Sequence, residues 1–373
     1  MSIGTSRKGS AHIVLWGEVR KDEGELYAKP RLTVTGQLGK AHMEETELKE
    51  FTSYDPKHIK FKERLANAIT DIVTLVYGFA YYKVGNWNRA IEILNHVHSS
   101  CGYLYKGLSL IKRSHRVLSP QQDLRSAIEN IEKTIDDIPR DLTLQSDLLT
   151  WVVYLNRAKA LALLGTLSQP KEAHVYLQDA VKAYRAALQG YTKAEFPQDW
   201  AMTQANLGSA LDDLGSRLDS KEGIRFIQES GKSYRDALQV YTKAGFPQDW
   251  AMTKTNLGIT LTHLGIRMGA GEGIKLLRGA VEVHKAALQV RTRVELPLKW
   301  ARTQTNLGIA LTKLGFRIGG EEGVLYLNES IICFDDALSI YDSTSYPESY
   351  REILDLKSKV KELIRVLESI RRR

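Results

Sequence analysis

One stretch of the sequence occurs three times at intervals of fifty residues. It reads "FPQDWAMTQANLGSALDDLG" at 196–215, "FPQDWAMTKTNLGITLTHLG" at 246–265 and "LPLKWARTQTNLGIALTKLG" at 296–315. A shorter copy in the same phase, "LNRAKALALLG", lies at 155–165. Repetition at this period predicts a stacked array, in which each unit buries its apolar side against its neighbours. The repeat therefore restricts the fold more than any other feature of the chain.

Each copy predicts a helix that begins at its proline. Pro197 fits a first helical turn because its missing N–H costs nothing there, and Asp199 complements the positive end of the helix dipole. The helix is expected to stop before "SRLDSKEG" and its later counterparts "IRMGAGEG" and "FRIGGEEG". Apolar and small residues recur at helical spacing. In the first copy these are Trp200, Thr203, Leu207, Ala210, Leu211 and Leu214.

A second helix is predicted after the turn, and the two helices of a unit are expected to pack antiparallel. Its apolar side consists of Ile224, Ile227, Tyr234, Ala237, Leu238 and Tyr241. Gly208 recurs as Gly258 and Gly308, although glycine inside a helix costs about 1 kcal/mol relative to alanine. We therefore expect the facing helix to come too close for a Cβ, with the seam of the unit at Leu207, Gly208, Leu211 and Ala237.

The segment "GFAYYKVGNWNRAIEIL" at 78–94 resembles a tetratricopeptide repeat. The residues at that family's signature positions are Gly78, Tyr81, Gly85, Trp87, Ala90 and Leu94. The fifty-residue units resemble long-helix members of the same superfamily and match it at Gly208, Leu211, Gly215, Ser230, Tyr234 and Ala237. This resemblance covers about residues 64–345 and implies an all-α, right-handed solenoid of tetratricopeptide-like helical hairpins. Six units are expected, at about 64–98, 102–139, 147–194, 197–244, 247–294 and 297–343.

The two ends of the chain depart from the repeat. The runs "HIVLWGEV" and "LYAKPRLTV" flank the polar turn "RKDEGE" and predict a β-hairpin, with Pro30 placing the second strand at an edge. A lone hairpin is marginal in water, so its strands should pack on the solenoid, pair with another chain or belong to a larger sheet. We expect a hairpin and linker at 1–60, the solenoid at 61–346 and a capping helix at 347–373. The apolar spacing of that last helix would also suit a coiled-coil seam.

Composition excludes several classes of protein. No apolar run approaches the ~18 residues that span a bilayer, and Glu18 and Arg20 interrupt the N-terminal run, so neither a membrane span nor a signal peptide is expected. Two cysteines, Cys101 and Cys333, argue against a disulfide framework and fit a reducing cytoplasm. The net charge of +8 is unevenly distributed, because residues 251–300 hold eight basic and three acidic residues whereas residues 301–350 hold three and seven. Alternating patches are weak support for nucleic-acid binding.

A catalytic or metal-binding arrangement is not found. The segment "TGQLGK" at 35–40 lacks the spacing of a phosphate loop, and His96, His98 and Cys101 lack a second ligand pair at zinc spacing. Adjacent helical carboxylates point in different directions and are predicted to be solvated. These pairs are Asp212–Asp213 and Asp335–Asp336. We predict no enzymatic activity, no cofactor and no metal.

Two further repeated residues have a structural interpretation. Trp200, Trp250 and Trp300 lie in the first turn of each repeated helix and are predicted to fill the joint between units rather than to stack nucleic-acid bases. Arg217, Arg267 and Arg317 lie near the end of the same helix and are predicted to cap carbonyl groups at a helix C-terminus.

A repeated asparagine indicates a partner site on the first helix of each unit. The row consists of Asn156, Asn206, Asn256 and Asn306. The resemblance implies that this helix lines a concave groove and that asparagine there holds the backbone of a bound peptide. An amide suits that role because it both donates and accepts, but it could equally fix the stacking of neighbouring helices. Further along the helix lie Ser209, Ile259 and Ile309, and then Asp213, His263 and Lys313, as expected for side chains that vary with the partner.

The sequence thus predicts a non-catalytic interaction scaffold or regulatory adaptor that binds a peptide or helix in the groove. Two alternatives remain open. The array could assemble with itself through the hairpin edge and the C-terminal helix, or bind nucleic acid through residues 251–300 and the arginine-rich tail. A protein or peptide partner is favoured over nucleic acid, and no membrane partner is expected.

Overall fold

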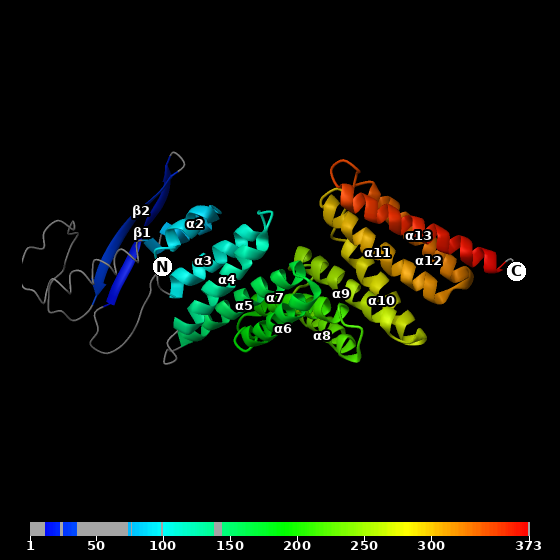
Figure 1. The fold of residues 1–373 in the computed structure, drawn as a ribbon, viewed down its shortest axis with the longest axis horizontal. Coiled ribbons are helices and arrows are strands. Elements are labelled where there is room, and N and C mark those ends of the chain that lie inside the picture. Colours follow the sequence, from blue (N-terminus) through cyan, green and yellow to red (C-terminus); the bar gives the residue numbers. More distant parts are fainter. Residues whose placement is uncertain are drawn as a thin grey trace, which may run out of the picture. The chain divides into compact units, whose positions relative to one another are not determined.

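The computed structural model describes residues 12–22, 25–35, 74–75, 77–97, 100–137 and 144–371 of the 373-residue chain (Figure 1). The chain is divided into two compact units, each containing several helices, at Met1–Leu142 and Thr143–Arg373. The predicted boundary between residues 60 and 61 and the predicted start of the first repeat at 64 lie outside the described residues.

The first unit contains the predicted hairpin. Strands β1 (His12–Asp22) and β2 (Glu25–Thr35) pair antiparallel, with Gly17 opposite Pro30. Since the described sheet has two strands, Pro30 lies on an edge strand, where its missing N–H is tolerated. Which surface or chain these strands pack against stays a prediction.

The helices of the first unit form successive packed pairs. Residues 77–83 are helical and are followed by a turn in which Gly85 adopts a positive φ of 79°. The helices after this turn are α2 (Trp87–Leu94), α3 (Ser100–Ser114) and α4 (Pro120–Asp137). Helix α3 packs on both α2 and α4, and Arg113 on α3 donates two hydrogen bonds to the Asp123 carboxylate on α4.

The second unit is a continuous stack of helical hairpins (Figure 1). Its helices are α5 (Leu144–Leu167), α6 (Pro170–Ala187), α7 (Pro197–Ser216), α8 (Lys221–Ala237), α9 (Pro247–Arg267), α10 (Ala270–Leu288), α11 (Pro297–Ile318), α12 (Gly320–Leu338) and α13 (Pro347–Arg371). The pairs α5/α6, α7/α8, α9/α10 and α11/α12 pack internally, each pair stacks on the next, and successive first helices also touch. The predicted all-α solenoid of helical hairpins is confirmed.

Helix starts follow the sequence, whereas some helix ends come later than predicted. Helices α7, α9 and α11 begin at the repeated proline. The first helices were expected to end before residues 266 and 316, but α9 continues to Arg267 and α11 to Ile318. Helix α11 ends at its C-cap Gly319, which has a φ of 65°, a conformation that favours glycine.

Tryptophan fills the joints between units, as predicted. Trp200 and Trp250 are partly buried against the core formed by α7 to α12. Trp300 packs in the same way against a second cluster, which α13 completes with Ile353 and Val360. A cation from the preceding loop lies over each ring, namely Lys193, Lys243 and Arg293.

Helix α13 ends the described stack with a polar outer side. Where α11 has Gly308 facing its second helix, α13 has the exposed Ser358, whereas Lys357 turns back toward α12 and pairs with Asp335. Such a side is typical of a helix that caps a repeat array. Among the helices described for this chain, none has the length and apolarity required to cross a membrane.

Candidate functional site

The predicted site residues share one side of α5, α7, α9 and α11, which we call the first-helix face. On α7, Asn206, Ser209 and Asp213 follow one another at spacings of three and four residues and are exposed or half-buried. The equivalent residues on α9 are Asn256, Ile259 and His263, and those on α11 are Asn306, Ile309 and Lys313. Asn156 holds the same place on α5. The geometry thus brings the whole predicted set onto neighbouring first helices within residues 144–371.

Close packing behind this face places the helices. A Cβ built on Gly208 would lie 3.0 Å from the Tyr234 ring, and one on Gly308 would lie 2.7 Å from Phe334. The seam glycine thus lies where an aromatic ring of the second helix comes too close for an unstrained Cβ, as the sequence predicted. The ring holds the first helix so that its opposite side faces outward.

The asparagines of the row differ in their contacts. The Asn156 amide donates to the Val152 carbonyl of its own helix at 2.7 Å. Burial raises the pKa of the Tyr234 phenol, and hydrogen bonding with Ser209 and Asn256 works against that rise. Asn206 and Asn306 are half-buried, and their side chains make no hydrogen bond within residues 144–371. Two of the four amides thus have a local structural role, and two are free to bind another molecule.

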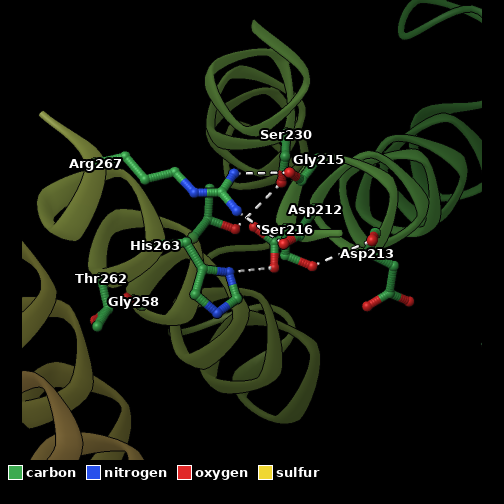
Figure 2. Close-up of polar contacts among 10 residues, drawn as sticks. Asp212, Asp213, Gly215, Ser216, Ser230, Gly258, Thr262, His263 and Arg267 are labelled. Carbon is green, nitrogen blue, oxygen red and sulfur yellow. Dashed lines mark hydrogen bonds and ion pairs between the residues drawn. The ribbon is translucent and has the colours of Figure 1, made fainter. Parts of the chain in front are cut away.

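One predicted variable residue joins two units (Figure 2). His263 Nδ1 on α9 lies 3.0 Å from Asp212 Oδ2 on α7. The prediction that Asp212 is solvated is wrong, because its side chain turns into the α7–α9 joint, where Asp212 is buried and its Oδ1 has no partner. Asp213 remains half-exposed, and burial followed by the neighbouring Asp212 charge raises its pKa above the ordinary value.

Two of the three repeated arginines cap a helix, as predicted, and in each case the helix belongs to the preceding repeat. Arg267 donates to the Gly215 and Ser216 carbonyls at the end of α7, at 2.7 and 2.8 Å (Figure 2). Arg317 donates in the same way to the Met268 and Ile266 carbonyls at the end of α9, at 2.6 and 2.9 Å. Arg217 is exposed and makes no such bond within the described residues. These long-range contacts lock the spacing of consecutive first helices.

The face changes character along the stack. Exposed apolar side chains collect on α9 and α11, where Met252 is 41%, Ile266 44% and Phe316 63% exposed. Ile309 packs against the cluster that α13 completes, so it is only partly available to a partner. The sequence prediction included neither Ile266 nor Phe316, although both continue the same helical stripe beyond the predicted end of the helix.

Two buried polar residues of the fifth unit were also missed. His284 is 0% exposed and lies against Gly258, and neither ring nitrogen has a partner. Arg291 is 4% exposed and donates to Thr255 Oγ1 on α9 at 3.0 Å and to Thr303 Oγ1 on α11 at 3.1 Å. Both stand where neighbouring units carry tyrosine or phenylalanine. Aligning the second helices as well as the first would have revealed them.

Amides, hydroxyls and apolar side chains at these positions suit reversible binding of a polypeptide more than bond cleavage. Within the part of the chain that the structure describes, no group of three or more His, Cys, Asp or Glu residues is placed to hold a metal ion. Of the trio considered from the sequence, His96 is exposed, Cys101 lies in the first turn of α3, and His98 lies outside the described residues.

Comparison with known proteins gives similarity at the level of structure alone. No family model and no curated protein matches the chain. Among solved structures it is similar to the S. pombe nuclear import adaptor Nro1, at 11% identity and a TM-score of 0.42 over 83% of this chain and 99% of that one. It is also similar to the C-terminal part of a TPR repeat-containing protein from Cytophaga hutchinsonii, at 10% identity and a TM-score of 0.33 over 76% and 98%. A third similarity is to the TPR2AB domain of yeast Sti1 in complex with an HSP90 peptide, at 16% identity and a TM-score of 0.24 over 79% and 99%. With such low scores, the repeat architecture rests on the helices of this chain alone.

Proposed function

We propose that this chain is a non-catalytic adaptor that binds an extended peptide or a helix of another protein along the first-helix face of α5, α7, α9 and α11. The observation that supports this most is the row of asparagines beside side chains that differ from unit to unit. The side-chain amides of Asn206 and Asn306 have no partner within residues 144–371, so they offer both a donor and an acceptor to a polypeptide backbone.

Rigid support is the second argument for this proposal. The seam rings and the arginine clamps hold the helices that carry the face. A preorganised surface loses little conformational entropy on binding, so a modest set of contacts suffices for useful affinity. The exposed apolar residues at the α9–α11 end supply the area that backbone hydrogen bonds alone do not.

Replacement of Asn206, Asn256 and Asn306 together by alanine tests the proposal. The two amides without a local partner, Asn206 and Asn306, contribute about 1 kcal/mol net each through hydrogen bonds, so this variant should weaken partner binding by roughly 30-fold. The matched control is Asn328→Ala, since Asn328 is exposed on α12 outside the face. Far-ultraviolet circular dichroism should show unchanged helicity.

A photo-cross-linking residue at Ser209 identifies the partner directly in a lysate of the native host. It should capture one protein or a small set, and the same reagent at Asn328 should not. Equal capture at both positions would refute the proposed face. Loss of helicity in the triple variant would show that the asparagines serve stacking instead.

Self-assembly is a second candidate, and the exposed Leu354 and Val366 on α13 favour it. Light scattering after size exclusion should then give a dimer or larger species that becomes monomeric in a Leu354→Lys, Val366→Lys variant. These positions are exposed, so the substitutions leave the covered side of α13 intact. A monomer for the unaltered chain excludes this candidate.

A further inference from the structure

The net charge of the first helices reverses along the stack. Helix α7 carries three aspartates and no basic residue. Helix α9 carries one aspartate together with Lys254 and Arg267. Helix α11 carries four basic residues and no acidic one, namely Lys299, Arg302, Lys313 and Arg317. Asp212 turns into the α7–α9 joint, so the first-helix face is acidic at α7 through Asp199 and Asp213 and basic at α11.

The basic residues of α11 are not required by the repeat. Lys299 stands where α7 and α9 have Asp199 and Asp249, and Arg302 stands where they have Met202 and Met252. Positions that tolerate aspartate or methionine in neighbouring units do not need a cation for folding. Their charge at α11 therefore requires another explanation.

These cations are also unpaired. Lys299, Arg302 and Lys313 are exposed and make no side-chain hydrogen bond or ion pair within residues 144–371. Arg317, by contrast, is occupied by carbonyls of α9. Three free cations on one stripe repel one another, and an incoming anionic segment would relieve that repulsion.

A buried cation lies between the helices that carry this stripe. Arg291 joins α9 to α11 through two threonine hydroxyls and has no carboxylate partner among the described residues, and its Nε is unbonded. Burial, and then the nearby Arg302, lower the pKa of Arg291 to about 10. Tyrosine occupies the equivalent place in three other units, at Tyr191, Tyr241 and Tyr341. Arg291 therefore adds to the positive potential at this end of the face.

The distance between Arg302 and Lys313 indicates whether the bound negative charge comes from a chain terminus or from acidic side chains. Arg302 and Lys313 are eleven residues apart on α11, which at 1.5 Å per residue is about 16 Å. A single terminal carboxylate could contact both only if the two side chains lay fully extended toward each other along the helix. Two acidic side chains about five residues apart in an extended chain span that distance, at roughly 3.3 Å per residue.

Apolar residues beside the cations define the rest of the ligand. Phe316 on α11 and Ile266 on α9 are exposed at the end of the face where Lys313 lies. Exposed aromatic and aliphatic side chains next to free cations form the centre and rim of a polypeptide interface.

We infer that the α9–α11 part of the first-helix face binds an internal acidic segment of a partner protein, with Asp or Glu side chains over Lys299, Arg302 and Lys313 and a bulky apolar side chain on Phe316 and Ile266. The inference rests on the proposed function and adds the chemistry and the orientation of the partner. Its acidic part lies over α11, and its neutral or basic part lies over α7.

A random peptide library tests this. The peptides are displayed inside a loop of a carrier protein, so that they have no free carboxyl terminus, and are selected against the full-length chain. Selected sequences should be enriched in Asp and Glu together with aromatic or large aliphatic residues. Affinity of the best peptide is then measured by fluorescence anisotropy.

Charge reversal distinguishes the outcomes. The double variant Arg302→Glu, Lys313→Glu should lose about tenfold or more in affinity. The control Lys232→Glu, Lys275→Glu makes the same change in net charge at exposed positions on α8 and α10 and should stay within about twofold.

The triple asparagine variant separates this inference from the proposed function. Peptides without an excess of acidic residues, unaffected by charge reversal but lost in the triple variant, would overturn the acidic-segment inference and leave the proposed function standing. Binding that survives both variants, or no selected peptide at all, would count against both. A random single-stranded RNA 20-mer that binds the same cations and displaces the selected peptide would overturn the inference in favour of nucleic acid.

Discussion

His284 predicts an acid-sensitive joint in the fifth unit. Its ring fills the space beside Gly258, where the neighbouring units place Tyr234 against Gly208 and Phe334 against Gly308. Unlike those rings, it carries two nitrogens that are buried without a hydrogen-bond partner. Burial, and then the nearby Arg291 charge, lower the pKa of His284 from 6.5 to about 3.

The sign of the pH effect follows from proton uptake. Below pH 6.5 the unfolded chain binds a proton at this histidine, whereas the folded chain stays neutral down to about pH 3. The free energy of unfolding therefore decreases as the pH is lowered from 6.5 toward 3, by about 1.4 kcal/mol per pH unit well inside this range. Between pH 7 and pH 5 the loss amounts to about 2 kcal/mol.

His284→Phe should remove this loss. Phenylalanine already occupies the equivalent place at residue 334, and the substitution removes two unsatisfied nitrogens. We expect about 1 kcal/mol or more of added stability at pH 7 and a larger difference from the unaltered chain at pH 5.

Hydrogen exchange measured on the full chain at pH 7, 6 and 5 tests this at the level of single helices, since a repeat array need not unfold in one step. Protection of α9 and α10 should fall with pH in the unaltered chain and much less in the His284→Phe variant. His263→Gln serves as the control, because His263 is half-exposed and bonded to Asp212. An equal pH dependence with and without His284 would refute the reasoning.

Other substitutions test the contacts that hold the stack. Arg317→Ala removes charged hydrogen bonds to the end of α9 and should lower the free energy of unfolding by about 1.5–3 kcal/mol in urea titrations, while Arg217→Ala should change it by less than about 0.5 kcal/mol. Gly308→Ala would place a Cβ 2.7 Å from the Phe334 ring and should cost about 1–3 kcal/mol, measured as a lower thermal midpoint. Gly231→Ala is its opposite: the nearest atom to the new Cβ is 3.5 Å away, so the gain in helix propensity should raise stability by up to about 1 kcal/mol. A similar loss in both glycine variants would contradict the assignment of the seam.

Sequence patterns predicted the elements and contacts that depend on local spacing. Pro197 marked a helix start, Gly208 marked a close approach, and Trp200 marked a joint, because each acts within one turn or one unit. The face itself also followed, since Asn206, Ser209 and Asp213 share a helical stripe whatever the helix packs against.

Contacts between units were not predictable in the same way. The two neighbouring aspartates were given the same environment, which holds for the half-exposed Asp213 but not for Asp212. Successive residues of a helix point about 100° apart, and this turns the Asp212 side chain into the joint. The capping chemistry of Arg267 was predicted but not the helix that it caps, since its acceptors lie more than fifty residues back in the chain, on α7. Such contacts depend on the stacking angle of two hairpins, which no local pattern encodes.

The arginine clamps give the stack a direction. The last carbonyls of α7 receive Arg267, and those of α9 receive Arg317, so a first helix acquires its final hydrogen bonds from the unit that follows it in the chain. During synthesis on a ribosome, the hairpins that begin with α7 and α9 would therefore leave the exit tunnel with the leading helix unfinished and would mature only after about fifty further residues had been added.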